Sequence, residues 1–296
     1  MGNILTKQFY RQRKDFEDSC AGRDAGLTFP EGVICSTDIA YADDGIKAHM
    51  LDIYRPEDSQ EKILPVIINV HGGGLIIGNK EFNRYFCALL CKKGFLVYSI
   101  EYRLIPDCLI YDQIADVFMA MDYIKERLAA DGGDSSHVYM AGDSGGACLI
   151  TYANAIQNST NIAMAANVTP SGLRINALGL ISGMFYTSRF DKIGLFLPKY
   201  LYGRDYKKTS FSKYVNPENR ELLNSLAPVW LVTSHNDFLR RYTTDFEKAL
   251  TRAEREHELV AFPKNKKLTH AFSVFEPFMP ESSEVIDMMV EYLRKF

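Results

Sequence analysis

A short apolar segment, a glycine-rich turn and a second apolar segment follow one another directly, and this order strongly constrains the fold. Residues 138–141 are apolar and few enough for a buried strand, and residues 147–156 are apolar and long enough for a buried helix. Between them lies a Gly-x-Ser-x-Gly motif centred on Ser144. A serine in a sharp strand-to-helix turn projects its hydroxyl outward, and glycine neighbours let the backbone fold back tightly. We therefore expect Ser144 to be a nucleophile.

Two other interpretations of this turn are possible. A glycine-rich turn after a strand can bind phosphate, but this sequence lacks the lysine of a P-loop and the spacing of a dinucleotide fingerprint. Gly-Asp-Ser-Gly-Gly also occurs in trypsin-like proteases, in which histidine and aspartate precede the serine on two β-barrels. Here strands and helices alternate around Ser144, and the best acid and base candidates follow it. The trypsin-like interpretation therefore fails.

Apolar segments alternate with segments of helical periodicity along most of the chain. The first two strands flank an Asp-Asp-Gly turn and predict a β-hairpin. The alternation predicts the α/β class, with a mainly parallel central sheet covered by helices on both faces. Strands are expected at residues 33–40, 46–54, 63–70, 95–100, 138–141, 175–181, 229–233 and 259–262, and helices at 82–91, 112–128, 147–156, 244–256 and 283–295.

Two stretches stand apart from this alternation. Residues 1–32 precede the first strand, and we expect one or two short helices there that form an N-terminal cap segment. Within the main domain, residues 33–296, the stretch at about 184–222 is rich in aromatic and charged residues and separates two strands. Ligands of open α/β sheets bind beyond the carboxyl ends of the strands, so we expect this insertion to help form a substrate pocket. A helical excursion that only adds stability is the alternative.

Composition excludes several classes of function. The 296 residues carry a net charge of −3, so the chain lacks the excess of positive charge that typically attracts nucleic acid. No run reaches the roughly 18–20 apolar residues of a membrane span, and the N-terminal residues lack the apolar core of a signal peptide. Six cysteines are scattered without metal-ligand spacing, which indicates free thiols and a cytoplasmic protein. Residues 1–6 fit the loose pattern for N-terminal myristoylation. Whether Gly2 is acylated does not follow from this pattern.

A serine hydroxyl is a weak nucleophile at neutral pH, so it needs a base. His270 follows the last expected strand and a charged loop, which lets it reach over the end of the sheet, and Asp237 follows the strand at residues 229–233. A carboxylate there would orient and stabilise the imidazolium, and the order Ser144, Asp237, His270 is that of α/β-hydrolases. Asp245 is a fallback acid and His235 a second possible base, two residues before Asp237. The remaining histidines are His71, expected to hold its loop by hydrogen bonding, His49 and His137, expected to be structural, and His257, which leads into a strand in a charged setting.

The tetrahedral intermediate of such a reaction needs N–H donors for its oxyanion. The backbone N–H of Gly145, directly after the serine, is one candidate. The others are expected from the glycine run at residues 72–74, which follows a buried strand and precedes the serine turn. Taken alone, such a run is often only a loop.

These motifs together resemble the hormone-sensitive-lipase-like family of α/β-hydrolase esterases. The matching residues are His71-Gly72-Gly73-Gly74, Glu101-Tyr102-Arg103-Leu104-Ile105-Pro106, Gly142-Asp143-Ser144-Gly145-Gly146, Asp237-Phe238-Leu239-Arg240 and His270-Ala271-Phe272. The resemblance spans roughly residues 35–295. It implies an α/β-hydrolase fold, serine carboxylester hydrolysis, an oxyanion hole from Gly73, Gly74 and Gly145, and a cap partly built from the N-terminus.

The sequence departs from the family pattern at three places. Gly145 stands where the family usually has alanine, Leu75 stands where an aromatic residue commonly follows the three glycines, and Ile110-Tyr111 replaces a common Phe-Pro pair. The first change keeps the N–H donor but is expected to loosen the turn. The other two are expected to change the walls of the substrate pocket.

The leading hypothesis is a serine carboxylesterase that acts on small or short-acyl esters and needs no metal or organic cofactor. An amidase or formamidase would use the same triad and stays an alternative. A receptor that binds ligands on an inactive hydrolase scaffold is a third, but such a protein is expected to lack a triad member, and Ser144, Asp237 and His270 are all present. The expected partner is a small ester substrate, and a homodimer is left open.

Overall fold

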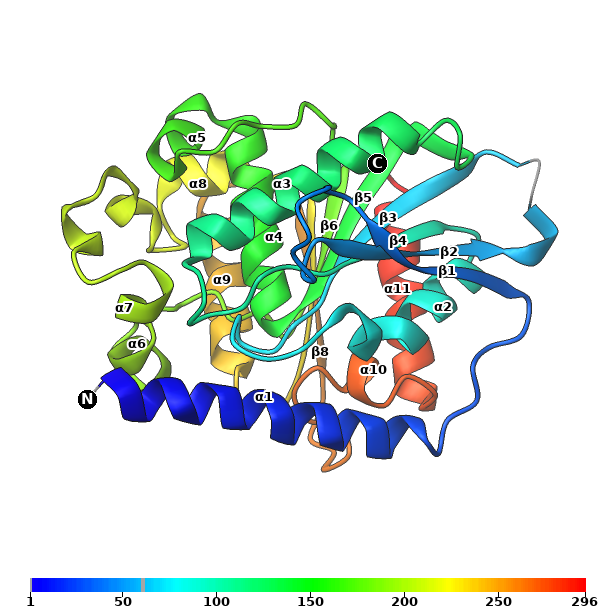
Figure 1. Cartoon of the computed structure of the whole chain (residues 1–296), viewed down its shortest axis with the longest axis horizontal. Coiled ribbons are helices and arrows are strands. Elements are labelled where there is room, and N and C mark those ends of the chain that lie inside the picture. Colours follow the sequence, from blue (N-terminus) through cyan, green and yellow to red (C-terminus); the bar gives the residue numbers. More distant parts are fainter. Residues whose placement is uncertain (1, 60–61) are drawn as a thin grey trace.

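The computed structural model describes residues 2–59 and 62–296, and its core is one mixed sheet (Figure 1). The eight strands of the described residues lie in the order β1-β2-β4-β3-β5-β6-β7-β8. The pairs β1–β2 and β2–β4 are antiparallel, and the other neighbouring pairs are parallel. The predicted mainly parallel sheet is confirmed. The strands are β1 Val33–Ala40, β2 Met50–Pro56, β3 Leu64–Val70, β4 Leu96–Ile100, β5 Gly133–Asp143, β6 Ala177–Ile181, β7 Val229–Ser234 and β8 His257–Phe262.

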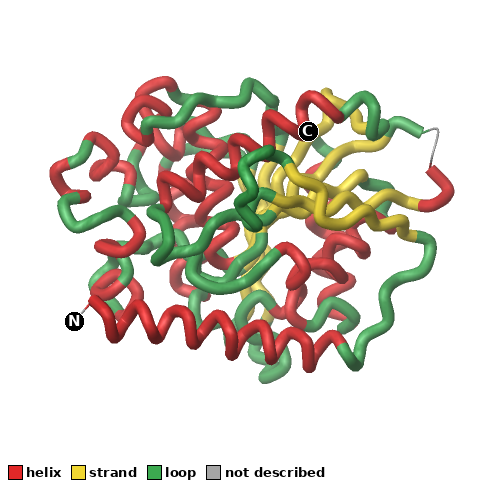
Figure 2. Tube along the Cα trace, in the orientation of Figure 1, coloured by secondary structure: helices red, strands yellow, loops and turns green. Residues whose placement is uncertain are grey.

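Helices cover both faces of this sheet, as Figure 2 shows for the Cα trace. Successive side chains of a strand point to opposite faces, so a strand buried on both sides must be apolar throughout. In β3, Ile68 joins the core beneath α3 and α4, whereas Ile67 joins the core beneath α2 and α11. The helices are α1 Gly2–Asp24, α2 Arg84–Lys92, α3 Ile110–Arg127, α4 Ser144–Asn158, α5 Thr160–Ala166, α6 Lys192–Phe196, α7 Pro198–Leu201, α8 Arg220–Asn224, α9 Arg240–Arg252, α10 Phe272–Phe275 and α11 Pro280–Leu293.

Several predicted boundaries were wrong by a few residues. Strand β2 begins at Met50 and not at residue 46, because the backbone turns just before it and the His49 N–H donates to the Ile46 carbonyl. Helix α9 covers Arg240–Arg252 in place of 244–256, and α4 begins at Ser144 itself. Apolar periodicity marks the middle of an element, whereas capping and turn contacts decide its ends.

The N-terminal residues form one 23-residue helix, α1, in place of the one or two short helices expected. This helix runs along one side of the molecule, past α6 and α7 at its start and α10 farther on (Figure 1). Contacts with distant segments hold it there, among them an edge-to-face contact of Phe9 with Tyr200 and another of Phe16 with Phe82. Met1, where the acylation pattern begins, lies outside the described residues.

Residues 184–222, which we call the insertion, lie between β6 and β7 and contain α6, α7, the short 3₁₀ segments Tyr206–Lys208 and Ser210–Tyr214, and the first residues of α8. Several of its aromatic residues pack against one another or against the main domain. The Tyr111 ring meets the Phe211 ring edge-to-face at 5.3 Å, and the Tyr202 ring lies 5.6 Å from the Tyr206 ring. The Phe211 ring also lies 5.4 Å from the ring of Tyr152 in α4, so this packing ties the insertion to α3 and α4.

All six cysteines are free thiols, without a disulfide partner. Among the described residues, no helix combines the length and the apolar character that a membrane crossing requires.

Candidate active site

Ser144 occupies a sharp turn between β5 and α4. Its φ angle is 50°, a left-handed value that costs a non-glycine residue on the order of 1–3 kcal/mol and is tolerated where the surroundings hold it. The neighbouring glycines permit this turn, because a Cβ atom on Gly146 would lie 2.1 Å from the Val70 carbonyl oxygen and one on Gly142 would lie 2.9 Å from it. Tight packing of the turn on the end of β3 thus requires glycine at both positions.

The loop at residues 71–78, which we call the glycine loop, follows β3 and lies against this turn. Gly73, Gly74 and Leu75 have consecutive positive φ angles of 101°, 61° and 69°. A Cβ atom on Gly73 would lie 2.0 Å from the Ile77 carbonyl oxygen, so only glycine fits there. A Cβ atom on Gly145 would lie 2.8 Å from the Leu75 nitrogen and 3.0 Å from the Gly74 nitrogen. The backbone of the loop at Gly74 and Leu75 therefore lies directly against Gly145 of the serine turn.

Asp143 connects the serine turn to the glycine loop, a role that the sequence analysis missed. Its Oδ1 atom accepts hydrogen bonds from the Gly72 N–H at 2.9 Å and from Asn83 Nδ2 at 3.0 Å. The carboxyl group is buried, and desolvation raises the pKa of Asp143 against the opposing effects of Asn83, His270 and His71. The only signal in the sequence was its place between Gly142 and Ser144 in the motif.

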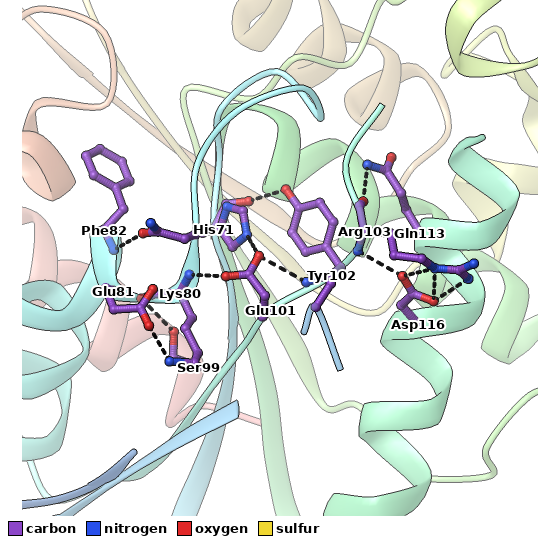
Figure 3. A network of polar contacts seen from close by, with 12 residues as sticks. His71, Lys80, Glu81, Phe82, Ser99, Glu101, Tyr102, Arg103, Gln113 and Asp116 are labelled. Carbon is purple, nitrogen blue, oxygen red and sulfur yellow. Dashed lines mark hydrogen bonds and ion pairs between the residues drawn. The ribbon is translucent and has the colours of Figure 1, made fainter. Parts of the chain in front are cut away.

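Glu101 connects the first residue of the glycine loop with Lys80, two residues beyond the end of the loop, as Figure 3 shows. Its Oε1 atom lies 2.9 Å from His71 Nε2, and its Oε2 atom accepts the Lys80 N–H at 2.9 Å. His71 is fully buried and also donates from Nδ1 to the Gly72 carbonyl at 2.8 Å, while Tyr102 donates to the His71 carbonyl. Burial alone would lower the pKa of His71, but the charge and hydrogen bond of Glu101 outweigh it and raise that pKa. The structure thus places His71 as a residue that orders the loop.

His270 and Asp237 form a hydrogen-bonded pair beyond the ends of β8 and β7. His270 Nδ1 lies 2.7 Å from Asp237 Oδ1. Asp237 is further held by the Leu239 N–H at 2.8 Å and by the Thr233 hydroxyl at 2.9 Å. Burial would raise the pKa of Asp237, but the hydrogen bond and charge of His270 outweigh it, so the pKa is lowered. An ionised carboxylate in this position fixes the imidazole ring with Nδ1 protonated.

The other acid and base candidates have different surroundings. Asp245 lies in α9 and pairs with Arg189 at 2.9 Å, and His235 is exposed with Nδ1 3.1 Å from Arg240. The three remaining histidines have carboxylate or carbonyl partners: His49 contacts Asp44 and Asp116, His137 contacts Asp134, and His257 contacts the Arg255 carbonyl.

A cavity of about 460 Å³ lies at the carboxyl ends of the strands and is lined by four of the six predicted site residues, whereas Asp237 and Gly145 are not part of its lining. Ser144, His270, Gly73 and Gly74 all line it. Its remaining lining is almost wholly apolar and comprises Phe16, Ile76, Ile77, Asp143, Met184, Ile193, Leu197, Phe238, Leu239 and Phe275. A second cavity, of about 540 Å³, lies near Arg55 and Gly132 at the opposite ends of the strands and contains none of these site residues.

The insertion lines the cavity with aliphatic and not aromatic side chains, namely Met184, Ile193 and Leu197. The expectation that Leu75 and Tyr111 form pocket walls was wrong for the described cavity lining, which contains Ile76 and Ile77 instead. Leu75 is fully buried behind the loop, and Tyr111 packs against Phe211. Among the residues that the structure describes, no group of three His, Cys, Asp or Glu side chains is arranged to hold a metal ion.

Gly145→Ala is expected to lower kcat about 10- to 100-fold. The added methyl group would press on the Gly74–Leu75 backbone and displace the N–H groups expected to stabilise the oxyanion, and removing one such donor outright typically lowers kcat about 10²–10³-fold. Gly22→Ala in α1 is the matched control, because its methyl group would meet nothing within 4 Å. Steady-state kinetics and thermal unfolding of both variants give the measurement. Full activity of Gly145→Ala would show that the loop moves aside without consequence.

Known proteins that are similar to this chain share its fold, and the similarity to a family model covers most of the chain. A family model described as the alpha/beta hydrolase fold matches residues 67–273. A rice protein described as a probable isoprenylcysteine alpha-carbonyl methylesterase ICME is 36% identical over 97 residues, which are 33% of this chain and 23% of that protein. Esterase LipQ of Mycobacterium tuberculosis is 32% identical over 120 residues, 40% of this chain and 28% of that protein. The aligned part of this chain thus spans about a quarter of the length of these relatives.

Solved structures resemble the whole chain. Esterase B from Lactobacillus rhamnosis superimposes with a TM-score of 0.92 at 22% identity, covering 99% of this chain and 95% of that chain. A structure described as bacterial heroin esterase superimposes with a TM-score of 0.73 at 22% identity, covering 98% of this chain and 92% of that chain. At these identities the similarity establishes the fold.

Proposed function

The chain belongs to the α/β-hydrolase family, in its hormone-sensitive-lipase-like group, and on this premise we propose that it is a serine carboxylesterase for small or short-acyl esters. The observation that carries the proposal is the shared cavity. Ser144, held in a strained turn, and His270, held by Asp237, open into one apolar space beside the backbone of Gly73 and Gly74. A nucleophile, an oriented base and backbone donors at one place are what acyl transfer requires.

In the proposed reaction, His270 accepts the proton of the Ser144 hydroxyl as its oxygen attacks the ester carbonyl. The negative charge that develops on the carbonyl oxygen is stabilised by the N–H groups of Gly73, Gly74 and Gly145. His270 then donates the proton to the leaving alcohol, and the acyl group stays on Ser144. Water, deprotonated by His270, releases the carboxylic acid and restores the hydroxyl. Asp237 stabilises the imidazolium that forms twice in this cycle.

The cavity supports an uncharged, compact substrate. Its volume of about 460 Å³ lies within the roughly 300–1,000 Å³ typical of small-molecule sites. Among the residues lining it, Asp143 and His270 are the ionisable ones, and Asp143 already accepts two hydrogen bonds. The similar esterase B has been crystallised inhibited by a C4-C4 tributyrin phosphonate, which is in keeping with short acyl chains. We propose that residues 1–32 and the insertion form the cap of this cavity, because Phe16, Ile193 and Leu197 line it.

Labelling with a fluorophosphonate probe, mapped by mass spectrometry, tests the proposal directly. We expect the probe on Ser144 in the unaltered protein and no labelling of Ser144→Ala. Rates for p-nitrophenyl esters from acetate to palmitate are expected to be highest for the short chains. A protein that cleaves N-formyl aromatic amines faster than aryl esters would instead be an amidase. Absence of both labelling and hydrolysis would favour a ligand-binding protein.

A further inference from the structure

Arg13 connects helix α1 to the glycine loop through its guanidinium group. Nε donates to the Ile76 carbonyl at 2.7 Å, Nη2 donates to the Ile105 carbonyl at 2.6 Å, and Nη1 pairs with Asp107 at 2.7 Å. The side chain is only 17% exposed, although it lies on a helix at the surface. One planar group thus joins three segments that are distant in sequence.

We propose that Arg13 is a positioning residue for the oxyanion hole, an inference that rests on the proposed esterase function. Gly73 and Gly74 adopt their positive φ angles without strain, but Leu75, with φ 69°, is a non-glycine residue in the left-handed region, so surrounding contacts must maintain the loop at this point. Two successive carbonyl groups directly after the glycines provide such contacts. The Leu75 carbonyl accepts the Ile105 N–H and Gln113 Nε2, each at 3.0 Å, and the Ile76 carbonyl accepts Arg13 Nε.

The orientation of the Ile76–Ile77 peptide influences the proposed oxyanion donors, because hydrogen bonds connect this part of the loop back to Gly73. The N–H groups of Ile76 and Ile77 both donate to the Gly73 carbonyl, at 3.1 and 3.0 Å. Rotation of the Ile76–Ile77 peptide would therefore break a bond to Gly73 and release the segment that carries the Gly73 and Gly74 N–H groups. Hydrogen bonds from charged donors are stronger than those from neutral donors, so the Arg13 contact opposes this rotation effectively.

Helix α1 has other attachments that do not involve Arg13. Phe9 contacts Tyr200, Phe16 contacts Phe82, and Arg23 donates to the Phe82 carbonyl at 3.0 Å. Loss of the guanidinium group is therefore expected to free the Ile76 carbonyl while the helix stays in place. Arg11 on the same helix is the matched control, because its side chain is 83% exposed and its contact with Asp15, at 3.7 Å, lies on the surface.

The test compares Arg13→Ala, Arg13→Lys and Arg11→Ala on p-nitrophenyl acetate, an ester too small to depend on the outer cavity wall. Removing one oxyanion donor typically lowers kcat by about 10²–10³, and Arg13 positions such donors without being one. We expect Arg13→Ala to lower kcat about tenfold with KM changed less than twofold, and Arg11→Ala to match the unaltered protein. A lysine ammonium cannot span three acceptors, so Arg13→Lys is expected to recover only part of the loss. Added guanidinium ion is expected to restore activity to Arg13→Ala.

A trifluoromethyl ketone gives a second readout, because its adduct with Ser144 places an oxyanion where the ester would. Its inhibition constant is expected to rise in Arg13→Ala by the same factor by which kcat/KM falls. If Arg13→Ala only raises KM, and Phe16→Ala does the same, Arg13 supports the cavity wall and the inference is overturned. If Arg13→Ala fails to fold, the test depends on Arg13→Lys, and full kcat in that variant would also overturn the inference. An unaltered protein without esterase activity or labelling at Ser144 would instead refute the proposed function on which the inference rests.

Discussion

Replacing Ser144 by alanine is expected to lower kcat for a short-acyl ester by about 10⁶-fold, and His270→Ala is expected to have a similar effect. The two groups act as a unit, because the hydroxyl attacks only when the imidazole accepts its proton, so losing either removes the covalent pathway. The double variant is therefore expected to be hardly less active than either single variant. Pre-steady-state and steady-state hydrolysis of p-nitrophenyl butyrate gives the measurement.

His235→Ala is the matched control for this prediction. His235 was the second candidate base in the sequence, but it is exposed and contacts Arg240. Its removal is expected to leave kcat and KM within about twofold of the unaltered values, the scale of an ordinary surface substitution. Equal losses for His235→Ala and His270→Ala would contradict the assignment of the base. Additive losses for Ser144→Ala and His270→Ala would contradict their joint action.

Asp237→Asn is expected to lower kcat by about 10⁴-fold while the protein stays folded. The carboxylate now accepts the His270 Nδ1–H, whereas an asparagine amide can present N–H to Nδ1 and favour the wrong tautomer of the ring. The amide oxygen, in the place of Oδ2, can keep the bond from the Thr233 hydroxyl, whereas the Leu239 N–H loses its acceptor because it donates to the same Oδ1 atom as His270. Since only this one further hydrogen bond is lost, the fold is expected to tolerate the change. Kinetics together with circular dichroism provide the measurement.

Asp245→Asn serves as the corresponding control. Asp245 was the fallback acid, and in the structure it pairs with Arg189 and with residues of its own helix, α9. We expect this variant to keep kcat within about twofold, with at most a modest change in stability from the lost ion pairs. A loss at Asp245 as large as that at Asp237 would show that the orienting carboxylate has been misassigned.

The sheet and the order of the candidate site residues could be predicted because patterns among neighbouring residues in the sequence indicate both. Buried parallel strands are apolar throughout, and the residues after their carboxyl ends meet at one edge of the sheet. Ser144 and Asp237 each follow such a strand, and His270 follows β8, a partly exposed strand at the edge of the same parallel sheet, so the topology directs all three toward one edge. Asp143 was missed because its contacts with Gly72 and Asn83 join residues about 60–70 positions apart.

The sequence by itself determined that the chain folds as a mainly parallel α/β sheet, and it predicted that a serine, an acid and a histidine follow the carboxyl ends of three of its strands. Only the tertiary structure decided that α1 is a single helix, that Arg13 reaches the Ile76 carbonyl, and that Gly145 lies too close to the glycine loop for a side chain. The tertiary structure also decided that the insertion turns aliphatic side chains toward the cavity and uses Tyr202 and Phe211 for packing. The physical reason is that periodicity and turn residues report on chain neighbours, whereas these features depend on distances between segments far apart in the sequence.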